Sequence, residues 1–158
     1  MNKSILLSIA SLSLCLFGCS NAKHRFKVAA TPLPHAQMLE FIRPDLKAKG
    51  IDMEVIIVED YNIPNRALAG HEVDANFFQH IPFMEEQIKQ FGYKIQNLAK
   101  IELEPMGVYS KKIHSLDKLA NKAKIAIPND PTNEARALAL LAAQGLIQMK
   151  NPRNLQAT

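Results

Sequence analysis

The sequence predicts an α/β fold built on a parallel sheet. Apolar runs of strand length alternate along the chain with segments whose apolar residues recur at helical spacing. Proline or glycine stands at most junctions between these segments, where it starts or ends an element. The run at residues 53–58 is apolar apart from Glu54, which is typical of a strand that a parallel sheet buries on both faces.

Six strands are expected, each a short and mainly apolar run bounded by turn residues. The first, at residues 26–30, ends at the turn Thr31-Pro32-Leu33-Pro34. The others are expected at residues 53–58, 73–77, 95–101, 106–109 and 124–127.

Five helices are expected, at residues 35–49, 62–70, 82–91, 115–120 and 131–144. Polar side chains are expected to cap three of them, namely Asn62, Ser115 and Asp130, and Pro131 is expected to be the first residue of the last helix. Glycines follow three of the helices and should close them, namely Gly50, Gly92 and Gly145. Pro44 lies inside the first helical pattern and is expected to kink or restart that helix.

Ligand-binding residues are expected in the loops at the carboxyl ends of the strands. In open α/β sheets, ligands bind at this edge, beside the N-termini of the helices that follow. The loops at that edge are residues 31–35, 60–64, 77–83 and 129–136.

Composition and charge exclude several classes of protein. The chain has 158 residues, of which 47% are hydrophobic and 22% charged, an ordinary globular mixture. Its formal net charge of +4 is spread along the chain, and the longest basic run is Lys111-Lys112, so nucleic-acid binding is not expected. The two cysteines, Cys15 and Cys19, both lie near the N-terminus, which excludes a disulfide framework or a thiolate metal site in the body.

The N-terminus has the pattern of a signal peptide. Lys3 precedes an apolar stretch at residues 5–17 that is too short to span a bilayer. The sequence Leu16-Phe17-Gly18-Cys19 resembles the lipobox of bacterial lipoproteins, although Phe17 departs from the small residue usual there. We expect a signal peptide at residues 1–18 and a lipid-anchored tether at residues 19–25, with the lipid on Cys19. An ordinary secretory signal that is cut nearby is the alternative.

Several motifs in the body resemble one protein family. They are Val28-Ala29-Ala30-Thr31-Pro32-x-Pro34-His35-Ala36, Asp60-Tyr61 with Pro64-Asn65, Asp74-Ala75-Asn76-x-Phe78-Gln79-His80, Met106-Gly107-x-Tyr109-Ser110-Lys111-Lys112 and Ile125-Ala126-Ile127-Pro128-Asn129-Asp130-Pro131. In this order they resemble the NlpA-type lipoproteins, the methionine-binding subunits of ABC importers. The resemblance extends from Phe26 to the C-terminus.

The resemblance implies a periplasmic-binding-protein-like fold of two α/β lobes with the ligand in the cleft between them. Residues 26–108 would form the first lobe and residues 109–158 part of the second. The chain stops short of the family's usual end, so it is expected to be C-terminally truncated and to lack further polar contacts to the amino acid.

The resemblance also implies which residues bind the ligand. Tyr61, Phe78 and His80 would form the pocket for the side chain of the amino acid, together with Phe83, which stands where the family usually has Tyr. Arg136 would hold the carboxylate of the ligand. Taken alone, these residues also fit ordinary structural positions: Tyr61 in packing, His80 bonded to loop backbone and Arg136 exposed on a helix.

Elementary chemistry agrees with those roles. A guanidinium can bind a carboxylate through two parallel hydrogen bonds, and Arg136 lies in the early turns of a helix whose N-terminus also favours an anion. A thioether is polarizable, and each contact with an aromatic ring contributes roughly 0.3–1.5 kcal/mol.

The sequence therefore predicts a substrate-binding lipoprotein that captures methionine, or a close amino-acid relative, for an ABC importer. It would be anchored by its lipid in the cell envelope, facing the periplasm or the exterior. Its expected partners are a membrane permease and the cytosolic ATPase of that permease. No enzymatic activity and no cofactor are expected, because the sequence contains no GxSxG, P-loop or HExxH motif.

Two alternatives remain open. A metal-binding lipoprotein could bring four histidines together with carboxylates on Zn²⁺ or Mn²⁺, although no two of them have ligand spacing. These are His35, His71, His80 and His114. The other alternative is a vestigial lipoprotein that binds no ligand.

Overall fold

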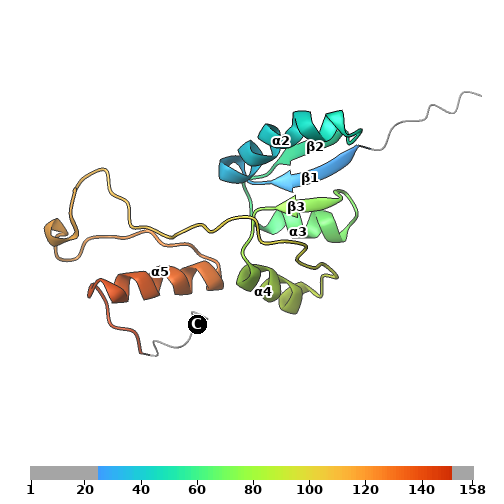
Figure 1. Cartoon of the computed structure of the whole chain (residues 1–158). Coiled ribbons are helices and arrows are strands. Elements are labelled where there is room, and N and C mark those ends of the chain that lie inside the picture. Colours follow the sequence, from blue (N-terminus) through green and yellow to red (C-terminus); the bar gives the residue numbers. More distant parts are fainter. Residues whose placement is uncertain (1–24, 151–158) are drawn as a thin grey trace, which may run out of the picture.

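A three-stranded parallel sheet organises the first half of the described chain (Figure 1). The computed structural model describes residues 25–150. The strands are β1 (Phe26–Ala30), β2 (Met53–Ile57) and β3 (Ala75–Phe77), in the order β2-β1-β3. Val28 of the central strand pairs with Val55 on one side and with Ala75 on the other. The predicted parallel α/β arrangement is confirmed in this region.

Four helices accompany the sheet and follow it. They are α2 (Gln37–Ala48), α3 (Asn62–Ala69), α4 (Ile81–Phe91) and α5 (Pro131–Ala143). A π-helical turn, η2 (Pro32–Ala36), leads into α2. Helix α2 packs on β2, whereas α3 packs on β1 and β3. Helix α5 lies away from the sheet and packs against α4 (Figure 1).

The core lies between β1 and α3. It is built from Ala29, Ala67 and Val73, with Ile56 and Leu68 packed against them. The small side chains let the helix approach the central strand closely. The expectation that both faces of the second strand are buried is wrong at its end, because Ile57 is 60% exposed. Strand β2 is an outer strand, and no helix among residues 25–150 covers its last residue.

Several predicted helix ends are confirmed. The Asp130 carboxylate accepts a hydrogen bond from the backbone N–H of Asn133 at 2.9 Å, and Pro131 is the first residue of α5. Gly92 ends α4 with a φ of +71°, a conformation that residues with a Cβ rarely adopt.

Two details of the predicted helices are wrong. Helix α2 does not restart at Pro44 but continues through it; the position is exposed, so the carbonyl that loses its backbone partner can bind water. Asn62 is not a cap but the first residue of α3. Its backbone N–H donates to the Asp60 carboxylate at 2.9 Å, so the aspartate two residues earlier starts this helix.

The region after α4 departs most from the prediction. The strands expected at residues 95–101, 106–109 and 124–127 are not formed, and the helix expected at residues 115–120 is only the single turn η3 (Leu116–Lys118). A strand needs a hydrogen-bonded neighbour, and none of residues 25–150 pairs with these segments. No helix in this described part of the chain is long and apolar enough to cross a membrane.

Candidate functional site

Four of the predicted site residues form one aromatic cluster, which we call the aromatic box. The ring centroids of Phe78 and Phe83 lie 5.9 Å apart, and that of Tyr61 lies 6.0 Å from Phe78 and 6.2 Å from Phe83. The His80 ring stacks on Phe83 at 6.4 Å. All these separations lie in the range of favourable aromatic contacts. The sequence therefore identified side chains that the fold brings together.

The box lies at the carboxyl edge of the sheet, where ligands bind in α/β folds. Phe78 directly follows β3, and His80 and Phe83 stand at the start of α4. Tyr61 precedes α3. Phe78 and Phe83 are buried, whereas Tyr61 is 49% exposed, so the phenylalanines form the floor of the box and the tyrosine its open side.

His80 offers an imidazole nitrogen to a ligand. Its Nε2 atom is buried and has no hydrogen-bond partner within the described residues. Burial lowers the pKa of His80, and the nearby charge of Arg136 lowers it further, which outweighs the opposite effects of Asp130 and Glu104. The imidazole is therefore mainly neutral at pH 7 and can donate or accept a hydrogen bond.

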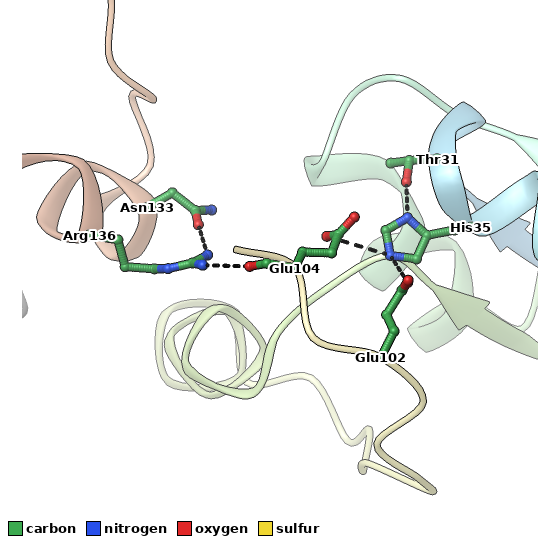
Figure 2. A network of polar contacts seen from close by, with 6 residues as sticks. All are labelled: Thr31, His35, Glu102, Glu104, Asn133 and Arg136. Atoms are coloured by element: carbon green, nitrogen blue, oxygen red, sulfur yellow. Dashed lines mark hydrogen bonds and ion pairs between the residues drawn. The ribbon is translucent and has the colours of Figure 1, made fainter. Parts of the chain in front are cut away.

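Arg136 approaches this site from α5, in the second half of the chain. One terminal nitrogen, Nη1, donates to Asn133 Oδ1 at 3.0 Å, and Nη2 donates to the carbonyl oxygen of Glu104 at 3.1 Å (Figure 2). All five predicted binding residues line one large open cavity of about 1650 Å³. A smaller cavity of about 750 Å³ shares Tyr61 and Phe83 with it.

The N-terminus of α5 is already occupied by an anion of the chain itself. Burial alone would raise the pKa of Asp130, but hydrogen bonds from Asn133 and Thr132 outweigh it and lower the pKa below its usual value. The ionised Asp130 carboxylate thus takes the place at this helix N-terminus where a ligand anion was expected. Of the two features proposed to attract a carboxylate, Arg136 is the one that remains.

A second polar group lies around His35 (Figure 2). Its Nε2 atom is 3.1 Å from Glu102 Oε1 and 3.9 Å from Glu104 Oε2, and its Nδ1 atom is hydrogen-bonded to the Thr31 hydroxyl at 2.6 Å. The three residues His35, Glu102 and Glu104 have donor atoms within 4.8 Å of one another, close enough to hold a metal ion together. The other histidines of the metal alternative, His71, His80 and His114, do not join this group in the described part of the chain.

Sequence reasoning missed a network of carboxamides beside the box, of which Asn65 is buried and the other two are half-buried. Asn65, Asn76 and Gln79 are joined by hydrogen bonds between their side chains. All three stand inside the motifs quoted for the family resemblance, but spacing alone gives no sign that they meet.

Solved structures with this fold include transport proteins. The chain matches the periplasmic substrate-binding protein of an ABC transporter from Coxiella burnetii with a TM-score of 0.76 and 46% sequence identity, over 84% of this chain and 56% of that one. The class is therefore clear, since the fold is that of the periplasmic substrate-binding proteins, as the sequence predicted.

The chain belongs to the NlpA lipoprotein family, whose family model matches residues 26–158. It is 40% identical over 155 residues to the methionine-binding lipoprotein MetQ of Bacillus subtilis, covering 88% of this chain and 57% of that protein. It is 41% identical over 150 residues to the D-methionine-binding lipoprotein MetQ of Salmonella typhi, covering 92% of this chain and 55% of that protein. The chain thus spans little more than half the length of these relatives.

Proposed function

We propose that this chain is a substrate-binding lipoprotein that captures methionine, or a close amino-acid relative, outside the cytosol. The observation that carries the proposal is that Arg136 lies near enough to His80 of the aromatic box for its charge to lower the pKa of His80, and that both line one open cavity. The names of the relatives from Bacillus subtilis and Salmonella typhi support the choice of methionine. The chain would bind its ligand without converting it.

The aromatic box suits the side chain of methionine. Phe78 and Phe83 meet edge to face, with an interplanar angle of 82°, and present ring edges and faces in one place. A thioether sulfur gains roughly 0.3–1.5 kcal/mol from each contact with an aromatic ring. The neutral His80 imidazole adds one polar group to an otherwise apolar pocket.

Arg136 suits the carboxylate. A guanidinium has five N–H donors, and the contacts among the described residues engage Nη1 and Nη2 once each. Its remaining donors can bind a carboxylate, while Asn133 and the Glu104 carbonyl hold the planar group in orientation.

The same proposal assigns the remaining parts of the chain. Residues 26–108 and 109–158 would belong to two lobes that close on the ligand in a hinge motion. The lipid on Cys19, which lies outside the described residues, would hold the protein at the membrane, where a permease with a cytosolic ATPase takes the ligand. A Cys19→Ser variant should leave the membrane fraction, and continued membrane retention would count against the anchor.

A thermal melt of the full-length protein tests the ligand. L-methionine at about 100 times its Kd should stabilise the folded state by about 2.7 kcal/mol and raise Tm by several degrees. D-methionine is run in parallel, and L-alanine is the control because it has the same charged groups but no thioether. A cooperative melt that neither methionine shifts would overturn the proposal and favour the vestigial lipoprotein.

The group around His35 favours a metal-binding lipoprotein as a second candidate. One imidazole and two carboxylates are a ligand set that Zn²⁺ and Mn²⁺ accept. If this candidate is right, EDTA lowers Tm and Mn²⁺ or Zn²⁺ restores it, and a Glu102→Gln variant loses that response. A melt that is indifferent to both treatments rules the candidate out.

A further inference from the structure

Two carboxamides, one buried and one half-buried, join the two segments that carry the aromatic box. Asn65 lies in α3, one turn after Tyr61, and Gln79 lies between Phe78 and His80. Asn65 Nδ2 donates to Gln79 Oε1 at 2.8 Å, and Gln79 Nε2 donates to Asn65 Oδ1 at 2.8 Å. Two reciprocal hydrogen bonds fix the orientation of the two side chains as well as the distance between them.

The surroundings leave Asn65 no other arrangement. Its side chain is 0% exposed, and Asn65 Oδ1 also accepts from Asn76 Nδ2 on β3 at 2.9 Å. A buried carboxamide is costly unless it is hydrogen-bonded, so loss of one partner leaves the other unsatisfied. Whereas an apolar side chain would merely fill this space, Asn65 sets the position of Gln79 relative to α3.

We propose that Asn65 and Gln79 are a positioning pair for the ligand site, an inference that rests on the proposed function. Asn65 is fully buried and lines neither cavity, so it would act through its neighbours, whereas Gln79 itself lines the large cavity. The pair would hold Tyr61 at the right separation from Phe78 and His80, so that the box exists before methionine arrives. A preformed box spares the ligand the cost of ordering it.

Substitutions by leucine, which is similar in size, test whether the pair positions the box or only stabilises the fold. Asn65→Leu and Gln79→Leu each remove the reciprocal bonds, and each should weaken L-methionine binding about tenfold or more at a temperature where the variant is folded. The double variant should bind no more weakly than the worse single one, because the two side chains act as one unit. The matched control is Gln37→Leu, at an exposed position of α2 that lines neither cavity, and it should bind like the wild type.

A second measurement needs no ligand. In the ligand-free, full-length protein, nuclear Overhauser effects between the Tyr61 and Phe78 rings should be seen in the wild type and in Gln37→Leu. They should weaken in Gln79→Leu, which replaces only a half-buried side chain and so keeps the test usable if Asn65→Leu does not fold.

The outcomes are distinct. A wild-type protein that ignores methionine overturns the proposed function, and the ring contacts then still decide whether the pair positions the box. If both variants melt earlier but keep the wild-type affinity and ring contacts, the pair only stabilises the fold and the positioning role is overturned.

Discussion

Two regions of the described chain differ in what becomes of their apolar runs. The sheet region, residues 26–91, pairs its apolar runs as parallel strands and packs α2 and α3 against them. The extended region, residues 93–130, has apolar runs of similar composition, yet the single turn η3 is its only described helix or strand. Leu103 is 92% exposed there, whereas Ala29 in β1 is 1% exposed. An apolar run therefore becomes a strand only where a neighbouring strand is within reach.

Hydrogen exchange should give the largest contrast between the regions. Backbone amides of β1 are bonded on both sides of a central strand and should exchange at least about a thousandfold more slowly than amides of residues 95–101. Mass spectrometry of the full-length protein after exchange measures both sets together. Equal protection in the two regions would mean that the extended region folds as firmly as the sheet, which would break the comparison.

The second largest contrast between the regions is expected in the free energy of unfolding after a carboxylate is introduced into each. Ala29→Asp places a carboxylate in the core between β1 and α3 and should lower the free energy of unfolding by on the order of 3–5 kcal/mol. Leu103→Asp is the matched control, and its effect should stay within about 0.5 kcal/mol. Urea denaturation followed by circular dichroism measures both. A large loss for Leu103→Asp would show that this side chain is packed rather than exposed.

Removal of the Arg136 guanidinium tests whether α5 contributes to a site that the sheet region mostly builds. Arg136→Ala should weaken methionine binding by about 1.5–3 kcal/mol, or roughly 10–100-fold, because a charged hydrogen-bonding partner is lost. Arg43→Ala is the control, since Arg43 pairs only with Glu40 on the exposed side of α2. Titration calorimetry measures both affinities. An unchanged affinity would mean that Arg136 does not bind the ligand and that the box alone forms the site.

The smallest expected effect concerns the cap of α5. The folded-state pKa of Asp130 lies below its ordinary value of 3.8. Asp130 therefore stabilises the fold fully above that value, and the contribution is lost as the pH falls through the folded-state pKa. Asp130→Ala should cost about 1 kcal/mol at pH 7. Asp130→Asn keeps a capping oxygen that does not titrate, so its stability should fall less between pH 5 and pH 2 than that of the wild type, by urea denaturation. Parallel curves would contradict the assigned pKa.

The ends of elements could be predicted well in both regions because their signals are local. The turn after residue 30, the glycine after α4 and the aspartate before α5 each mark an element end through their own backbone chemistry. The strands expected after residue 94 failed for a different reason. Apolar content at strand spacing indicates that a segment can pair, but it carries no information about whether a partner lies beside it.

The candidate site also has a part that could be predicted from the sequence and a part that could not. The convergence of Tyr61 with Phe78 and Phe83 follows from their loops, which meet at one edge of a parallel sheet. The pairing of Asn65 with Gln79 could not be predicted, because burial of a polar side chain depends on what covers it. At the N-terminus of α5, the predicted cap Asp130 is confirmed, and its negative charge competes with a ligand anion for the same backbone N–H groups.

The residues of the box lie close together in the sequence, whereas Arg136 lies far from them. All four box residues fall between Tyr61 and Phe83, whereas Arg136 joins them only across the extended region. Closing a short loop costs less chain entropy than closing a long one, and local contacts form sooner. During refolding the apolar half of the site should assemble early and its cationic half late. The refolding chain would then be able to contact the apolar side chain of a ligand before Arg136 is in place to select ligands that carry a free carboxylate.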